Sequence, residues 1–178
     1  MPGERTLYRK IQVTLEYANE GKHTSVEALE EYMYQRSPTN FVYYWRDEKD
    51  KVRQDYSRNS IRDTVQLCVE LGLVNDGELT QLGLNAVDPR RFPIIVGKQV
   101  TKFLTRKDMG IDSVQEAIGK IIKLSTPKPP TADEIWSHLK RNGSEIDLQT
   151  FKRLINLLGE CKVLWMSQKR IYLPSVPQ

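Results

Sequence analysis

The sequence has few cysteines and no long hydrophobic run, and both absences exclude classes of protein. Its 178 residues include only two cysteines, Cys68 and Cys161, too few for a disulfide framework and too widely separated for a zinc knuckle. The longest apolar stretch, Phe92 to Gly97, is far too short to cross a bilayer. The first residues contain no hydrophobic signal-peptide segment. We therefore expect a soluble, cytoplasmic or nucleoid-associated protein with buried thiols and no membrane contact.

The residue patterns that carry catalysis are also missing. The two histidines, His23 and His138, stand outside any metal-ligand spacing. The sequence has no phosphate-binding loop, dinucleotide loop or serine nucleophile elbow. Glu160 and Lys162, with Asp147 upstream, superficially match part of a metal-dependent nuclease core, but a helix end and a hairpin are predicted there instead of the required mixed sheet. The sequence therefore predicts a non-enzymatic protein without cofactor or metal.

Neither sign of charge dominates the chain. Twenty-seven Lys and Arg residues against 23 Asp and Glu residues give a net charge of +4, which permits an anionic partner without requiring one. The hydrophobic fraction of 39% is high enough for a folded core. Much of the basic excess is local, because residues 90–107 contain six basic residues and no acidic one. Lys98, Lys102 and Arg106 repeat there at intervals of four, which predicts a connecting helix with one basic face.

The first half of the chain is predicted to contain three helices and a hairpin. Apolar residues three and four apart predict a helix over residues 5–19. Thr24 begins a capping box, in which a Thr or Ser is followed three residues later by Glu, and this pattern predicts the start of a second helix. A third helix is predicted from Ser60 to Gly72. The tight-turn sequence 75–77 then predicts a hairpin whose second arm covers residues 78–83.

The second half has a similar order of signals. Capping boxes at Ser113 and Thr131 predict two helices, and Asp147 is placed to cap a third that ends at Gly159. Short apolar strands on either side of the polar turn 167–170 predict a final hairpin. The two halves therefore have the pattern of a degenerate repeat.

One insertion reconciles the two halves. Thr131 follows Thr24 by 107 residues, whereas Leu158 follows Leu71 by 87 residues, which leaves a difference of 20. Residues 37–56 have no counterpart in the second half and account for it. The insertion holds an aromatic run, Phe41 to Trp45, which is predicted to be a strand or a hydrophobic plug. The nearly balanced charged run after it is predicted to be the solvated face of a helix.

Three helices followed by a hairpin resemble the winged helix-turn-helix family. The residues that carry the resemblance are Leu71 to Val74 and Leu79 to Gly83, which are similar to the common LGLV…LTxxG phrase of its wings. A second, less typical copy begins at Leu157. The layout is also similar to the tandem recognition regions of type IIS restriction and nicking enzymes. The resemblance implies a mainly α fold with small β-hairpins (α+β), in which two winged-helix modules, 1–89 and 111–178, are joined by a connecting helix, 90–110.

The resemblance also implies contacts with double-stranded DNA. In family members that bind DNA, the third helix enters the major groove and the wing contacts phosphate or the minor groove. Arg, Lys, Asn and Gln supply the groups that contact base edges and phosphates. The candidate DNA-binding residues lie on the two third helices, the connecting helix and the second wing tip: Arg58, Arg62, Gln66, Lys98, Lys102, Arg106, Gln149, Thr150, Lys152, Arg153, Asn156, Lys169 and Arg170.

Two functions follow from this resemblance. The first is a double-stranded-DNA-binding protein that acts as a transcription regulator or as the recognition component of a restriction, defence or mobile-element system. The second is a protein-interaction scaffold in a multisubunit assembly, because winged helices also bind protein through the same surfaces. The near-balanced charge and the run from Phe41 to Trp45, a possible surface for a protein partner or homodimer, favour the scaffold.

Overall fold

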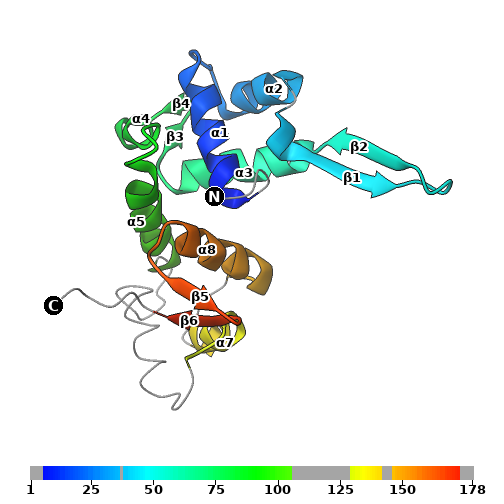
Figure 1. Cartoon of the computed structure of the whole chain (residues 1–178). Helices are drawn as coiled ribbons and strands as arrows, with labels where there is room; N and C mark the ends of the chain where they lie inside the picture. The colour runs from blue at the N-terminus through cyan, green and yellow to red at the C-terminus, as the bar shows by residue number, and fades with distance from the viewer. Residues whose placement is uncertain (1–5, 37, 106–128, 142–145, 173–178) are drawn as a thin grey trace. The chain divides into compact units, whose positions relative to one another are not determined.

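The described residues form a mainly helical structure with short antiparallel hairpins. The computed structural model describes residues 6–36, 38–105, 129–141 and 146–172 (Figure 1). Its helices and three two-stranded sheets confirm the predicted α+β class. The chain divides into two compact units, Met1–Phe92 and Pro93–Gln178. None of the described helices has the length and hydropathy to cross a bilayer.

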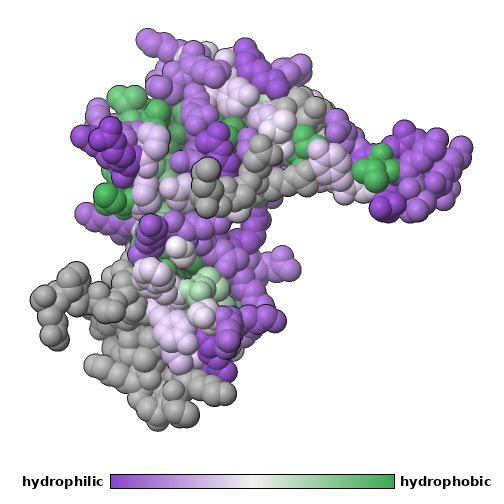
Figure 2. All heavy atoms as spheres, viewed as in Figure 1, coloured by the Kyte–Doolittle hydropathy of each residue, from purple (hydrophilic) through white to green (hydrophobic). Residues whose placement is uncertain are grey.

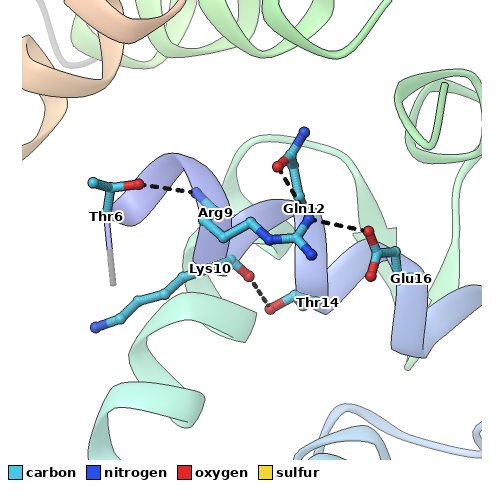
Figure 3. A network of polar contacts seen from close by, with 6 residues as sticks. All are labelled: Thr6, Arg9, Lys10, Gln12, Thr14 and Glu16. Carbon is cyan, nitrogen blue, oxygen red and sulfur yellow. Dashed lines mark hydrogen bonds and ion pairs between the residues drawn. The ribbon is translucent and has the colours of Figure 1, made fainter. Parts of the chain in front are cut away.

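Unit 1 is built on three helices, α1 (Leu7–Asn19), α2 (Val26–Arg36) and α3 (Arg58–Glu70). Their apolar stripes meet in one core, because side chains three and four residues apart share a helix face. The fully buried members of this core include Ile11, Leu15, Leu29, Met33, Ile61, Val65 and Cys68. Helix α1 begins at the cap Thr6, whose hydroxyl accepts a hydrogen bond from the Arg9 N–H at 3.3 Å (Figure 3).

Two predicted helix starts in unit 1 are wrong by a few residues. Helix α2 is capped by Ser25 rather than Thr24, because the Ser25 hydroxyl accepts the Ala28 N–H at 3.1 Å. Helix α3 is capped by Ser57 rather than Ser60, and the Ser57 hydroxyl accepts the Ser60 N–H at 3.0 Å. Ser60 lies inside the first turn, where its hydroxyl accepts a hydrogen bond from Lys10 Nζ of α1 at 2.9 Å. A hydroxyl can cap only from the non-helical residue that precedes a helix.

The hairpin after α3 is shorter than the sequence predicts. Strands β3 (Val74–Asn75) and β4 (Glu78–Leu79) pair across a turn in which Asp76 and Gly77 have φ of 50° and 84°, which confirms the tight turn. The predicted second arm, 78–83, is a strand only over its first two residues. Thr80 caps the helix α4 (Gln81–Ala86), because its hydroxyl accepts the Gly83 N–H at 3.0 Å.

The insertion forms a hairpin of its own. After a short 3-10 helix, η1 (Thr39–Phe41), strand β1 (Val42–Arg46) pairs with β2 (Val52–Tyr56). Val42 to Trp45 of the aromatic run therefore form a strand, one of the two predicted alternatives, whereas Phe41 ends η1 and is buried. The prediction of a helix face for the charged run is wrong, because this run closes the hairpin. Asp47 stabilises the turn, since its carboxylate accepts the N–H groups of Lys49 and Lys51 and a hydrogen bond from Arg53.

Unit 2 contains α5 (Phe92–Thr105), which begins at the last residue of unit 1, followed by α7 (Ala132–Arg141) and α8 (Leu148–Glu160). The predicted capping box at Thr131 is confirmed: its hydroxyl accepts the Glu134 N–H, and the Glu134 carboxylate accepts the Thr131 N–H. The apolar spacing of this half predicts one inward face on each of two helices. On α5, Val96, Val100 and Leu104 of this face are buried and Phe103 is half-buried, and on α8 the whole face is buried, namely Phe151, Leu154, Ile155 and Leu158. The capping box predicted at Ser113 lies outside the described residues.

The prediction that the last helix ends at Gly159 is wrong by one residue. Helix α8 continues to Glu160, and Lys162 adopts the left-handed conformation with φ of 60°. The last hairpin, β5 (Trp165–Ser167) and β6 (Arg170–Tyr172), turns at Gln168 and Lys169, which both have positive φ. Gly159 stays helical, because the carbonyls of the last turn are satisfied by the N–H groups of residues 161–163.

Helices α3 and α8 have closely matched boundaries. Both contain 13 residues, and the cap Asp147 follows the cap Ser57 by 90 residues. The C-cap Cys161 follows the C-cap Leu71 by the same 90 residues. A two-stranded hairpin follows each helix. The predicted pairing of Leu71 with Leu158 was therefore displaced by three residues.

The cap at Asp147 leads to a prediction about stability and pH. Its carboxylate accepts the Thr150 N–H at 2.9 Å, and this hydrogen bond is the main cause that lowers the pKa of Asp147. We expect Asp147→Ala to lower the free energy of unfolding by about 1 kcal/mol, and Asp147→Asn to lower it much less. A lowered folded-state pKa gives stability that is present above the ordinary aspartate pKa and lost as the pH falls through the folded value. Urea unfolding at neutral and acid pH should therefore show the Ala variant approaching wild type in acid.

Candidate nucleic-acid interface

One face of α8 carries a row of exposed polar side chains. Gln149, Lys152, Arg153 and Asn156 are all exposed and lie at helical spacings of three and four, opposite the buried stripe. Helix α7 precedes α8 in the described chain, and the β5–β6 hairpin follows it (Figure 1). Two amides and two cations on one surface provide groups for both base edges and phosphates.

The members of the α8 face differ in how strongly they are held. Lys152 forms an exposed ion pair with Asp133 of α7 at 3.2 Å, which is weak in water. Thr150, also a predicted contact, donates its hydroxyl hydrogen to Asp147 at 2.7 Å and so takes part in the helix cap. Arg153 and Asn156 make no hydrogen bond or ion pair within the described part of the chain. These two side chains are therefore more available for a ligand than those of Lys152 and Thr150.

In the β5–β6 hairpin, only one of the two predicted wing-tip residues lies at the tip. Lys169 lies in the turn and is exposed, as expected of a wing tip. Arg170 instead belongs to β6, where Nη1 donates to the Pro129 carbonyl at 2.7 Å and lies 3.7 Å from Glu134. Its side chain stabilises the junction of β6 with the start of α7 and is not at the tip. Sequence reasoning missed the exposed cross-strand pair Trp165 and Tyr172 on the same hairpin.

The corresponding face of α3 has less free positive charge. Arg58 donates a hydrogen bond to Glu31 at 2.8 Å and stacks on the Tyr34 ring, 3.5 Å from the ring centroid. Hydrogen bonds from Gln35, and then from Arg58, hold the pKa of Glu31 below its ordinary value, so this pair is charged at neutral pH. Arg62 lies 3.9 Å from Asp63, and Gln66 is exposed. The α3 face is therefore closer to neutral than the α8 face.

The basic face of α5 borders a groove within unit 2. Lys98 and Lys102 are both exposed, and they line a cavity of about 540 Å³ together with Lys162 from the turn after α8. The close approach of α5 to this turn requires Gly97, because a Cβ there would lie 2.8 Å from Val163 Cγ2. Sequence reasoning missed Lys162, which is 60 residues from Lys102. Arg106, the third cation predicted on this face, lies outside the described residues.

Burial makes the two thiols unreactive. Cys68 and Cys161 are both buried free cysteines, and burial raises the pKa of each to about 12. Among the described residues, no three His, Cys, Asp or Glu side chains are grouped to hold a metal ion.

No protein-family model matches this chain, and neither a curated protein nor a solved structure is significantly similar to it. The structure does bring together predicted contacts within unit 2: the polar row of α8 lies on one helix face, and Lys98 and Lys102 border one groove. These contacts are candidates on the grounds of their own chemistry.

Proposed function

We propose that this protein is a non-enzymatic double-stranded-DNA-binding protein that uses two winged-helix-like modules. The observation that carries the proposal is the exposed row on α8, from Gln149 to Asn156, followed by a hairpin with Lys169 at its turn. A helix of 13 residues is about 20 Å long and presents such a row to the major groove. The hairpin after it is in the chain position of a wing.

The chemistry of the row suits a duplex. Arg153 has the planar guanidinium that pairs with guanine N7 and O6 or with phosphate, and Gln149 and Asn156 carry the amides that pair with adenine. Lys152 and Lys169 are point charges suited to phosphates. Lys98, Lys102 and Lys162, on the groove beside α5, add further cations in the same unit. We therefore assign the larger share of DNA affinity to unit 2.

The biological role fits either a transcription regulator or the recognition component of a restriction, defence or mobile-element system. Such a role places the protein in the cytoplasm or at the nucleoid. Both assignments follow from DNA binding and depend on it.

Salt dependence tests this function directly. We expect the full chain to bind a fluorescent 20-base-pair duplex with an affinity that falls linearly in log–log form as salt rises, because each neutralised phosphate releases about 0.9 counterion. About five phosphate contacts give a slope of about −4.5. Fluorescence anisotropy at several salt concentrations measures the slope. Weak binding with no dependence on salt would rule out the DNA-binding function.

An interaction scaffold is the second candidate. Two hairpins carry exposed aromatic side chains, namely Tyr43, Tyr44 and Trp45 on β1, and Trp165 and Tyr172 on β5–β6. Exposed aromatic residues are enriched where proteins bind each other. If the protein shows no DNA binding in the salt titration but binds a protein partner through these aromatic residues, the result would support the scaffold instead.

A further inference from the structure

The β5–β6 hairpin presents two exposed aromatic side chains on one of its faces. Trp165 on β5 lies opposite Tyr172 on β6 in the antiparallel register, and opposite residues share a face of a sheet. These side chains are 61% and 39% exposed. On the other face Ile171 is fully buried, and a Cβ added at Gly159 of α8 would lie 3.7 Å from Met166 Sδ. That face therefore packs on unit 2, and the aromatic pair lies on the outer face.

The chain around this pair carries only positive charge. Residues 161–172 contain Lys162, Lys169 and Arg170 and no Asp or Glu. Arg170 lies near Glu134, but Lys162 and Lys169 are exposed and make no ion pair within the described part of the chain. Lys162 precedes the hairpin and Lys169 lies in its turn. An aromatic surface with unpaired cations near both ends of the hairpin suits a polyanion.

The β1–β2 hairpin of unit 1 provides a comparison with different charge. Its Trp45 is 48% exposed, close to the exposure of Trp165. Residues 42–56 contain four basic and four acidic residues, so this hairpin has no net charge. Figure 2 shows hydrophilic side chains over its end, where Arg53 and Asp47 form an ion pair at 2.8 Å. An exposed tryptophan is therefore present on both hairpins, and an excess of positive charge only on β5–β6.

Aromatic side chains bind nucleic acid by stacking on the flat faces of the bases. In a continuous duplex the neighbouring base pairs cover these faces, so stacking on them requires bases to be unstacked first. Unpaired bases expose their faces already, and stacking on an aromatic residue adds affinity whatever the base is. An outer aromatic pair flanked by lysines therefore matches DNA with unpaired bases better than it matches the groove of a plain duplex.

We propose that Trp165 and Tyr172 stack on unpaired bases next to the duplex that α8 binds. Such stacking depends on the proposed DNA-binding function and narrows the ligand to DNA in which a duplex joins a single strand. The polar row of α8, from Gln149 to Asn156, binds the paired part. Lys162 and Lys169 supply positive charge for the phosphates beside the stacked bases. Because stacking tolerates every base, the pair recognises the structure of the DNA and not its sequence.

Tailed duplexes test this stacking with the full chain. One 20-base-pair duplex carries about six unpaired thymines at each strand end, a length within the range of single-strand binding sites. Its control carries abasic tails of the same length, which keep the phosphates and remove the bases. We expect wild type to bind the thymine-tailed duplex about tenfold more tightly than the abasic one. Trp165→Ala should abolish this preference. Fluorescence anisotropy at a fixed salt concentration measures both affinities.

Three further variants separate stacking from other effects of the substitution. Trp165→Phe keeps an aromatic face and should retain most of the preference for thymine tails. Trp165→Leu keeps apolar surface without an aromatic face and should lose it. Trp45→Ala, the matched change on the neutral hairpin, should leave the preference unchanged. Circular dichroism checks that all variants fold, which we expect because both tryptophans lie outside the buried core.

The outcomes distinguish a failure of stacking from a failure of DNA binding. If wild type binds thymine and abasic tails equally well and with a salt slope, the stacking is overturned, DNA binding stands, and the aromatic pair is left to a protein partner. A preference that survives Trp165→Ala, or that Trp45→Ala removes, also overturns the stacking. If the blunt duplex and both tailed duplexes fail to bind, the DNA-binding function and the stacking are overturned together.

Discussion

Replacing Arg153 with Ala and Lys169 with Asn is expected to lower the affinity for duplex DNA by about 100-fold. Each removed contact with a base edge or phosphate is worth on the order of 1–2 kcal/mol, and 1.4 kcal/mol is tenfold in affinity. Asn is chosen at Lys169 because it tolerates the positive φ of 65° at that position. The slope of log affinity against log salt should also fall by about two, if both cations contact phosphate. Anisotropy titrations measure both quantities.

A matched control separates these contacts from the loss of net charge. Lys22 and Lys140 are exposed and lie outside the α8 face and its hairpin. Replacing both with Ala removes the same two positive charges, and we expect less than a threefold change in affinity. Equal losses in the two double variants would show that binding follows the net charge alone and would exclude a specific role for α8. Lys152 is left unchanged because its removal also disturbs Asp133.

Phe151→Ala is expected to destabilise unit 2 by about 3–5 kcal/mol, because it leaves a large cavity under α8. Phe151 is fully buried, and the unit is small enough for this loss to unfold it. Trp136 should report the change, since its indole N–H donates to the Ile146 carbonyl at 2.9 Å in the folded unit. Urea unfolding followed by tryptophan fluorescence and circular dichroism measures the loss.

A control variant and the remaining helical signal test whether Phe151→Ala acts through the core of unit 2. Phe151→Leu keeps most of the buried volume and should cost less than about 1.5 kcal/mol. Unit 1 has its own buried core, which includes Ile11 and Leu29, so part of the helical signal should survive in Phe151→Ala. A loss below about 1 kcal/mol would show that α8 does not depend on this core. Complete loss of helix in a single transition would show that the units do not unfold separately.

Helix positions were predictable where one local signal was unambiguous. Thr131 and Asp147 cap helices as predicted, because their side chains accept the N–H groups of Glu134 and Thr150. Neighbouring hydroxyls compete elsewhere: Ser25 caps in place of Thr24, and Ser57 in place of Ser60. Apolar spacing cannot separate such competitors, since both choices leave the buried stripe unchanged.

The charged run at 47–51 shows the limit of local charge patterns. A balanced run suits a helix face and a hairpin turn equally well. Asp47 stabilises the turn, because its carboxylate accepts the Lys49 and Lys51 N–H groups within the loop and a hydrogen bond from Arg53 on β2. Pairing depends on contacts along both strands, which periodicity in a short run does not reveal.

The sequence by itself determined the α+β class, the buried stripes of α5 and α8 and the polar row opposite the stripe of α8, because helical spacing places residues on a face without reference to the rest of the chain. Only the tertiary structure decided which cations stay available. In the folded chain Arg170 donates a hydrogen bond to the Pro129 carbonyl, and Arg58 donates one to Glu31. Lys162 lines the same groove as Lys98. These outcomes join residues 27 to 64 positions apart, and such contacts form only when separate elements pack together.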